Sequence, residues 1–364
     1  VYSRPYNLPD YDTGPAAPLP EYPTDLGKTI LDLVSKPEVA SKDWVIRQYD
    51  HEVRGKTALK PIQGPIGKDV PGDSSVLKPV DDSWKGLALT ADVNPYLMEA
   101  NPYHGTMSAV EEVCRNLAAV GARIDSLADC LCFGNPRKPD IMGQFKASCE
   151  ALRDAAMAVD VPYVSGNVSL YNETSDGAIP PTPVLMGVGL VEDIRNCTTS
   201  DMKKDGSIWL IGKTKEEMGA SLYYRSIGKD CPNIPKTDFD SFMPRMEQLI
   251  LAIEQGEVVA CHDISTGGIA TAVIEMCMSG VGASIRLGED MRADVELFSE
   301  SNGRWIVQVA NGKDKDFARR FDYATRIGEV GNKIAFSKGN DVIAELEIDE
   351  LRNAWTMPVW DRLA

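Results

Sequence analysis

Histidine is scarce in this sequence, and the spaced cysteine pairs that bind zinc are missing. The chain has 364 residues with three histidines and eight cysteines, and no Cys-x-x-Cys pair occurs. Zinc sites need Cys and His clusters at fixed spacing, so a zinc protein is excluded. Most of the cysteines lie in apolar runs, and we expect reduced core residues of a cytoplasmic protein.

Basic residues are also scarce relative to acidic ones. The 38 basic residues face 54 acidic ones, which gives a net charge of −16, and this charge repels the phosphate backbone of nucleic acids. No apolar run reaches the roughly 18 residues of a membrane-spanning helix. The first ten residues lack the basic and apolar regions of a secretory signal. We therefore expect neither nucleic acid nor a membrane as a partner.

A phosphate-binding P-loop is absent as well, although Gly-Lys-Thr occurs three times, at 27–29, 55–57 and 212–214. A P-loop needs a second glycine five residues earlier. Those positions hold Tyr22, Asp50 and Ser207. The simple P-loop kinase interpretation therefore fails.

The length predicts two or three domains. Residues 1–23 contain six prolines and favour an extended linker. The polar stretch 195–206 predicts a boundary, with one domain over 24–198 and another over 199–364. The chain begins at Val1 without Met, and we expect it to be a piece of something longer.

Segments with the hydrophobic spacing of helices follow segments with the pattern of strands along the chain. This order predicts two mixed α/β domains of the α+β class. The segment 55–84 is rich in Gly, Pro, Asp and Lys and predicts a loop. The expected helices cover 24–34, 40–49, 107–117, 141–159, 214–226, 241–254, 268–279 and 313–321. The expected strands cover 86–93, 124–133, 162–170, 184–191, 208–211, 258–264, 284–287 and 305–310.

Polar and small residues interrupt the expected strand 162–170. Gly166 would let a ligand approach the backbone, and Asn167 offers an oxygen to a hard cation such as Mg²⁺. Ser169 lies two residues further, on the same side of a strand as Asn167. A glycine bulge with an asparagine cap explains the pattern equally well.

Two further motifs have a chemical and a structural interpretation. Asp129 is a carboxylate in an apolar strand, and it needs a ligand, a cation or a hydrogen-bond donor, or else it caps a strand end. His262-Asp263 precedes a Gly267-Gly268 turn that opens a helix, where exposed amides bind anions well. An ordinary turn with Thr266 near the helix N-cap is the alternative.

Six segments together resemble the carboxy-terminal half of phosphoribosylformylglycinamidine synthase, in the small form of the synthetase subunit that works with a separate glutaminase. They are YDHEVRGKT (49–57), ALTADVNPY (88–96), DCLCFGNPRKPD (129–140), SGNVSLYNET (165–174), CHDISTGGIA (261–270) and FSESNGRW (298–305). The resemblance covers essentially the whole chain. It also extends to the superfamily of aminoimidazole ribonucleotide synthetase.

The resemblance implies a purine-biosynthesis ligase with domain order A1-B1-A2-B2, of which this chain would be A2 and B2. The family converts formylglycinamide ribonucleotide, ATP and ammonia to formylglycinamidine ribonucleotide, ADP and phosphate. It implies that Asp129 and Gly166 contact ATP, that Asn167 binds Mg²⁺ and that Ser169 contacts substrate. The implied partners are the amino-terminal half, a glutaminase subunit and a small accessory subunit.

The family's catalytic histidine lies in a His-Asn-His-Pro-Ser type motif that this sequence lacks, so we assign no catalytic residue. Asp263 would match, by internal symmetry, a metal ligand of a degenerate pseudo-site. Two alternatives remain: a non-catalytic scaffold half that holds a structural nucleotide and docks the glutaminase, and another enzyme of the superfamily such as aminoimidazole ribonucleotide synthetase.

Overall fold

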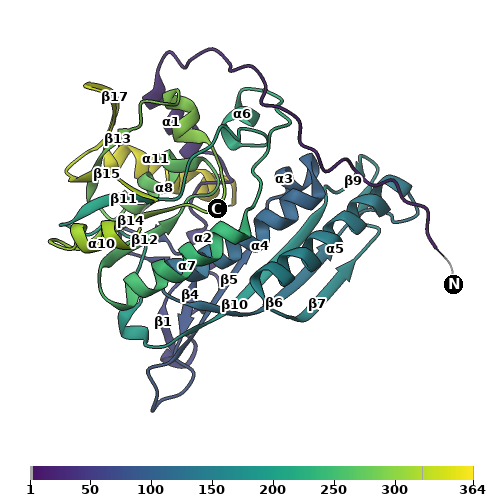
Figure 1. Ribbon diagram of the computed structural model, residues 1–364, viewed down its shortest axis with the longest axis horizontal. Coiled ribbons are helices and arrows are strands. Elements are labelled where there is room, and N and C mark those ends of the chain that lie inside the picture. The colour runs from purple at the N-terminus through teal and green to yellow at the C-terminus, as the bar shows by residue number, and fades with distance from the viewer. Residues whose placement is uncertain (1–2, 322, 364) are drawn as a thin grey trace.

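Two mixed β-sheets, each with helices packed against it, organise the chain (Figure 1). The structure is a computed structural model that describes residues 3–321 and 323–363. The α+β class expected from the sequence is confirmed. Among the described residues, no helix combines the length and the apolar character needed to cross a lipid bilayer.

The first sheet has six strands in the order β1-β4-β5-β10-β6-β7, and only β6 and β7 are parallel neighbours. Helices α4 (Pro102–Ala119) and α5 (Pro139–Val159) cover one face. Along β10, Leu185 is buried while Met186 and Leu190 are 40% and 45% exposed, so the opposite face is uncovered. The strands are β1 (Thr57–Leu59), β4 (Ser75–Leu77), β5 (Gly86–Asp92), β6 (Arg123–Cys132), β7 (Tyr163–Ser169) and β10 (Thr182–Val191).

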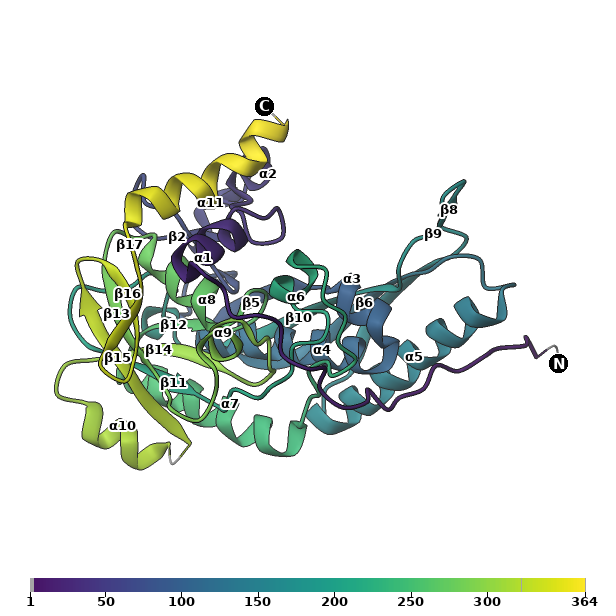
Figure 2. The ribbon, with the colours of Figure 1, turned by 90° about the horizontal axis from the view of Figure 1, so that it is seen from above.

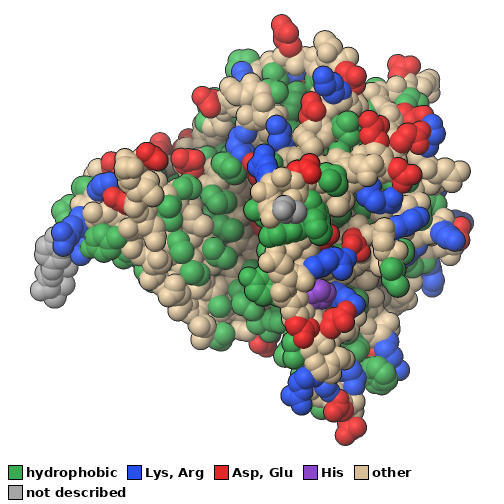
Figure 3. Space-filling model, turned by 180° about the vertical axis from the view of Figure 1, so that it is seen from behind, with side chains coloured by type: hydrophobic (Ala, Val, Ile, Leu, Met, Phe, Trp, Pro, Cys, Tyr) green, Lys and Arg blue, Asp and Glu red, His purple; other side chains and the backbone are tan. Residues whose placement is uncertain are grey.

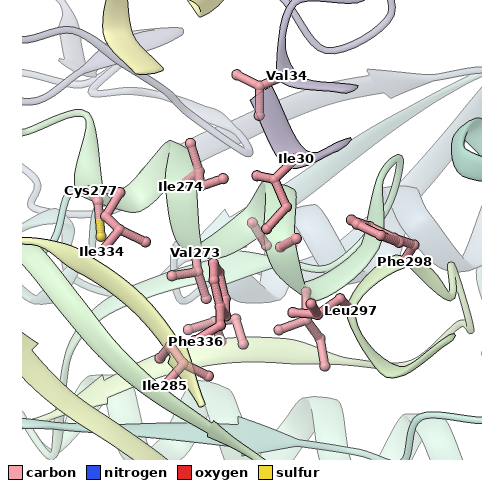
Figure 4. Close-up of a cluster of buried hydrophobic side chains, with 14 of the residues drawn as sticks. Ile30, Val34, Val273, Ile274, Cys277, Ile285, Leu297, Phe298, Ile334 and Phe336 are labelled. Atoms are coloured by element: carbon pink, nitrogen blue, oxygen red, sulfur yellow. The ribbon is translucent and has the colours of Figure 1, made fainter. Parts of the chain in front are cut away.

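The second sheet has seven strands in the order β12-β14-β11-β15-β13-β16-β17. The cluster in Figure 4 lies on one face, where Ile30 and Val34 of α1 approach Ile274 of α8. The strands are β11 (Ser207–Ile211), β12 (Val258–Asp263), β13 (Gly282–Leu287), β14 (Trp305–Val309), β15 (Ala324–Gly331), β16 (Ile334–Lys338) and β17 (Asp341–Leu346). The helices of this half are α6 (Leu222–Ser226), α7 (Phe239–Glu254), α8 (Gly268–Cys277), α9 (Ala293–Phe298), α10 (Asp314–Arg320) and α11 (Ile348–Leu363).

Helix α4 joins the two sheets into one packed body. A single hydrophobic cluster contains Val113 and Leu117 of α4 together with Phe242 of α7 and Trp305 of β14. The indole Nε1 of Trp305 donates to the Arg115 carbonyl oxygen at 3.1 Å. The polar face of α4 is therefore buried too, and its charged side chains need partners inside the protein.

The first helices pack on the second sheet rather than on the first. Helix α1 (Leu26–Val34) packs against α8, α11 and β17, and α2 (Asp43–Ile46) lies beside α11 (Figure 2). The Trp360 indole donates to the Asp43 carboxylate at 3.0 Å. The expected domain 24–198 is thus divided in space, because the apolar face of α1 is buried in the core of the other half.

Residues 3–23 contain no helix or strand and run along the surface of both halves (Figure 2). The Asn7 amide donates to the Pro139 carbonyl at 3.0 Å, and the Tyr11 ring stacks on Tyr103 at 4.6 Å. His104 Nε2 lies 2.9 Å from the Tyr11 carbonyl oxygen. His104 therefore anchors this segment.

Three local expectations were wrong. Only the end of 214–226 is helical, because Ala220 has a left-handed φ of 58° and Ser221 caps a new helix there. Only Asp43–Ile46 is helical within 40–49. The expected loop 55–84 contains four short strands, β1 to β4, of two or three residues each, which pair with neighbours that the local pattern does not reveal. The remaining small elements are α3 (Pro95–Ala100), β2 (Ile62–Gln63), β3 (Val70–Pro71), β8 (Glu173–Thr174) and β9 (Gly177–Ala178).

Candidate functional site

The parallel strands β6 and β7 bring two of the expected site residues into contact. Asp129 lies directly opposite Gly166 in the register, although 36 residues separate them in the sequence. A Cβ atom placed on Gly166 would lie 2.9 Å from Asp129 Oδ2. Only glycine leaves room for this carboxylate, which gives Gly166 a physical reason to be there.

The Asp129 carboxylate has no hydrogen-bond donor or ion-pair partner among the described residues. Its side chain points to the helix-covered face, because Asp129 is paired with the buried Leu185 of β10. Partial burial raises the pKa of Asp129. A half-buried carboxylate without a donor is available to a ligand.

Asn167 and Ser169 point to the opposite, uncovered face of the sheet. The Asn167 amide donates to Cys130 Sγ at 3.4 Å, and the Ser169 hydroxyl donates to Asn172 Oδ1 at 3.2 Å. The two residues thus share one face, as the strand period predicts. The four expected site residues therefore cluster at one end of β6 and β7 but divide between two faces of the sheet.

The loops that follow these two strands are tied to each other. The Asn172 side-chain amide donates to the Phe133 carbonyl at 3.0 Å, and Glu173 Oε1 accepts from the Asn135 amide at 2.8 Å. Lys138 pairs with Glu173 at 3.0 Å. The turn Gly134-Asn135-Pro136 is therefore held at the edge of the expected site.

A second cluster of ionisable groups lies between the two halves, and the sequence motifs pointed to only two of its members, His262 and Asp263. Arg115 Nε lies 3.1 Å from Asp263 Oδ2, and its Nη2 lies 3.2 Å from Glu112. Arg115 also pairs with Glu111 one helical turn before it. All of these side chains come from α4 and the end of β12.

His262 extends this cluster on the other side. Its Nδ1 lies 2.7 Å from Asp73 Oδ1, and its Nε2 lies 3.1 Å from Glu275 Oε2. Burial alone would lower the pKa of His262, but the charge of Asp73 and the hydrogen bonds to Asp73 and Glu275 hold it well above the usual value. Asp73 follows β3, which the sequence analysis took for a loop.

Carboxylates outnumber cations in this cluster, and the raised pKa values of these carboxylates show that their charged forms are unfavourable there. Burial raises the pKa of Asp73 to about 6 and that of Asp92 to about 7, against the opposing charges of His262 and Arg115 respectively. Burial also raises the pKa of Glu112 well above its usual value. Asp92 Oδ2 is buried and has no hydrogen-bond partner within the described part of the chain. These groups need protons or a cation to be stable together.

The donor set of this cluster fits a hard divalent cation. Ligand atoms of Asp73, His262 and Asp263 lie within 4.8 Å of one another, beside a cavity of about 390 Å³. Carboxylate oxygens, which Asp73 and Asp263 offer here, are the ligands that Mg²⁺ prefers. Asn167, in contrast, offers one amide oxygen, so a cation there needs ligands from a phosphate or from another chain.

The Gly-Gly turn is structural. Gly267 is the N-cap of α8 with a φ of 80°, so Thr266 does not cap this helix. The Gly267 amide donates to Glu300 Oε1 at 2.7 Å, and the Gly268 amide donates to the Ser265 carbonyl at 3.0 Å. Both amides are already used, which favours the interpretation as an ordinary turn.

Glu300, in the FSESNGRW segment, gives a testable pH dependence. Its Oε1 also accepts from the Leu222 amide at 2.8 Å, and burial raises its pKa to about 7 from 4.5 despite these two hydrogen bonds. The Glu300 carboxyl therefore binds its proton more tightly in the folded protein than in the unfolded chain. The contribution of protonated Glu300 to the free energy of unfolding is complete below pH 4.5 and is lost as the pH rises through 7.

Replacing Glu300 with Gln keeps an oxygen acceptor and removes the buried charge. We expect the free energy of unfolding at pH 8 to rise by up to about 3 kcal/mol, and to rise much less at pH 5. Urea denaturation at both pH values measures this. An equal effect at the two pH values would contradict the buried charge as the cause.

Comparison with known proteins supports the division into two domain types. Residues 71–191 match the family described as AIR synthase related protein, N-terminal domain, and residues 202–337 match its C-terminal domain. The chain is 38% identical to phosphoribosylformylglycinamidine synthase subunit PurL of Methanothrix thermoacetophila over 352 residues, which covers 92% of this chain and 45% of the relative. It is 34% identical to the same subunit of Thermoplasma acidophilum, over 98% of this chain and 47% of the relative. The chain thus spans about half the length of the curated relatives it matches.

Solved structures show the same fold. PurL of Thermotoga maritima, complexed with FGAR, has a TM-score of 0.72 at 19% identity, and the match covers 92% of this chain and 54% of that one. A HypE–HypF complex has a TM-score of 0.56 at 16% identity, over 74% of this chain and 90% of that one.

Proposed function

The chain belongs to the AIR synthase-like superfamily, and we propose that it supplies the carboxy-terminal half of a phosphoribosylformylglycinamidine synthase. The reaction would be the ATP-dependent amidation of formylglycinamide ribonucleotide in purine biosynthesis, carried out in the cytoplasm. The observation that carries this proposal is the register of β6 and β7. It places Asp129 against Gly166 and puts Asn167 and Ser169 beside them.

The resemblance of the surrounding motifs to the synthetase family supplies the roles that we propose for these residues. Asp129 and the Gly166 backbone would contact ATP, and Ser169 would contact the substrate, at the neighbouring ends of β6 and β7. Asn167 would offer its oxygen to Mg²⁺, which supplies charge neutralisation for phosphoryl transfer when it is bound. Phosphoryl transfer depends on positioning and electrostatics, so the absence of a nucleophile in this set agrees with the proposal.

The uncovered face of the first sheet suggests where the amino-terminal half would pack. Met186 and Leu190 of β10 are exposed there, and Leu87 and Leu89 of β5 lie opposite Leu190 and Val188. Seen from behind, hydrophobic side chains gather over this side of the molecule (Figure 3). A sheet face of the same kind from the other half would bury them, and would complete a site that has no catalytic residue of its own here.

Further partners would be a glutaminase that supplies ammonia and a small accessory subunit. A Thermotoga maritima structure described as PurLQS matches this chain with a TM-score of 0.70. This likeness supports the expectation of an assembly of several subunits.

Reconstitution tests the proposal. The chain alone should form no amidine, and its mixture with an amino-terminal half of the synthetase should form amidine from formylglycinamide ribonucleotide, ATP and ammonia. Asn167→Ala in the mixture should lower the rate about tenfold or more, because the metal loses a ligand. Ser165→Ala, on the same face of β7, is the matched control and should retain the rate. Full turnover by the chain alone would contradict the split site.

The buried cluster favours one second candidate, a scaffold half that holds a structural nucleotide through a metal. The carboxylates of Asp73 and Asp263 would be the metal ligands. This candidate predicts that the reconstituted mixture keeps its rate when Asn167 or Asp129 is replaced, and that Mg²⁺ raises the melting temperature of the chain alone. Loss of activity in the Asn167→Ala mixture decides against it.

A further inference from the structure

A basic cavity lies mainly on the second half of the molecule, and it adjoins the buried Arg115 cluster through Glu111, which belongs to both. Its volume is about 460 Å³, which is the size of a pocket for a small organic ligand. Its wall contains four basic side chains, which come from the loop after β11, the segment before α7 and α7 itself. They are Lys213, Lys215, Lys236 and Arg245.

These cations are poorly neutralised by the protein. Lys213 has no ion-pair partner among the described residues, and Lys236 has only Asp12, at 4.0 Å. Lys215 lies 3.6 Å from Glu217. In a chain with a net charge of −16, such a local excess of positive charge requires a reason.

Arg245 is held in place by neutral oxygens rather than by a carboxylate. Its Nε donates to the Ser241 carbonyl at 2.8 Å, and its Nη1 donates to the Gly303 carbonyl at 3.2 Å. The guanidinium keeps its full charge and lies over the Tyr323 ring, 5.7 Å from the centroid. It is therefore fixed before any ligand arrives, which lowers the entropy cost of binding.

Two carboxylates also line the cavity, so its four basic side chains outnumber the acidic ones. Glu111 is buried, pairs with Arg115 and accepts from the Gly303 amide at 3.1 Å. Asp238 caps α7 through the Ser241 amide at 3.3 Å. Because Asp238 occupies the end of this helix, the four side chains, and not the helix N-terminus, supply the positive charge.

One side of the cavity is apolar and rigid. Phe242 and Pro244 line it beside Tyr323, and Phe242 stacks on the buried Trp305 at 5.6 Å. The Asn302 side chain is fixed by hydrogen bonds to Ser108 at 2.8 Å and Thr237 at 2.9 Å. The cavity lining thus combines basic side chains with apolar ones.

We propose that this cavity binds a phosphorylated metabolite of mononucleotide size, with its phosphate at Lys213, Lys215 and Lys236 and its ring beside Pro244 and the Arg245 guanidinium that lies over Tyr323. Lysine binds phosphate as a point charge, and a planar guanidinium stacks on a flat ring. The site shares no residue with Asp129, Gly166, Asn167 or Ser169, so the proposal goes beyond the proposed function and does not depend on it.

Calorimetric titration of the 364-residue chain with AMP tests the proposal. The buffer contains EDTA, so that a site requiring Mg²⁺ is silent. The double variant Lys213→Gln/Lys236→Gln should weaken AMP binding at least about tenfold, because each charge-assisted contact contributes more than a neutral one. Lys204→Gln/Lys313→Gln removes two exposed lysines outside the cavity and should change the affinity less than twofold. Ribose 5-phosphate should bind more weakly than AMP, with the same dependence on Lys213 and Lys236.

Three outcomes would overturn the proposal: no AMP binding to the unchanged chain at millimolar concentration, equal binding of adenosine and AMP, or equal affinities of the two double variants. Asn167→Ala should leave this binding unchanged while it lowers the rate of the reconstituted synthetase. Failure of the cavity proposal and failure of the proposed function would therefore be seen in different assays.

Discussion

Replacing Arg115 with Met is expected to lower the free energy of unfolding by about 3–5 kcal/mol, the range found when one partner of a buried ion pair is removed. Arg115 is fully buried and contacts Glu111, Glu112 and Asp263. Without its charge these carboxylates face one another in a medium that solvates them poorly. Urea denaturation at pH 7.5, followed by tryptophan fluorescence, measures the loss.

Arg123→Met provides a matched control. Arg123 also pairs with two glutamates, Glu247 at 2.8 Å and Glu254, but its side chain is one-third exposed. The same substitution at Arg123 should lower the free energy of unfolding by about 1 kcal/mol or less, because water screens the charges. Equal losses in the two variants would show that the buried cluster has no special electrostatic role.

The pH dependence of the Arg115→Met variant is a second measurement. Burial and the neighbouring acids already hold the pKa values of Asp92 and Glu112 above normal. In the variant these carboxyls can bind protons as the pH falls, which relieves the repulsion. The difference in the free energy of unfolding between the variant and the unchanged chain should therefore become smaller from pH 7.5 to pH 5.5. A difference that stays constant would indicate lost packing instead.

Gly166→Ala is expected to lower the activity of the reconstituted synthetase at least about 100-fold while the chain stays folded. The new Cβ would lie 2.9 Å from Asp129 Oδ2 and 3.2 Å from its Cγ. The Asp129 carboxylate must therefore turn away, and a displacement of about 1 Å in a positioning group costs about 100-fold in rate. Steady-state assays of the mixture, with ADP release as the readout, measure this.

Gly331→Ala is the control for the general effect of alanine in a strand. A Cβ at Gly331 would meet its nearest atom, Ser284 Oγ, at an ordinary distance of 3.5 Å. The free energies of unfolding of both variants should lie within about 1 kcal/mol of that of the unchanged chain, because β7 is an edge strand and β15 has space for a Cβ atom at Gly331. Normal activity of Gly166→Ala would refute the role given to the contact between Asp129 and Gly166.

Local pattern was enough for several long elements, but it missed the helix Ile348–Leu363 and failed where distant partners decide. The helix expected at 141–159 is observed at Pro139–Val159, and the strand expected at 184–191 at Thr182–Val191. The four short strands between 57 and 77 were missed, because two- and three-residue strands exist only through their pairing. The helix expected at 214–226 was overridden by packing, which places Ala220 in a left-handed conformation and bonds the Gly219 amide to the Asn233 carbonyl at 2.9 Å.

The sequence by itself was enough to exclude several classes of protein and to predict the α+β class. Its segment motifs also indicated the superfamily. All of these conclusions depend only on residue type and local spacing. Only the tertiary structure decided that Asp129 contacts Gly166 and that Asn167 points to the other face, since strand register joins residues far apart in the chain. It also gathered Asp73, Arg115 and His262 into one buried cluster, and placed four cations of an acidic chain around one cavity. Charge is a sum over the sequence, but the field at a site depends on which charges the fold brings together.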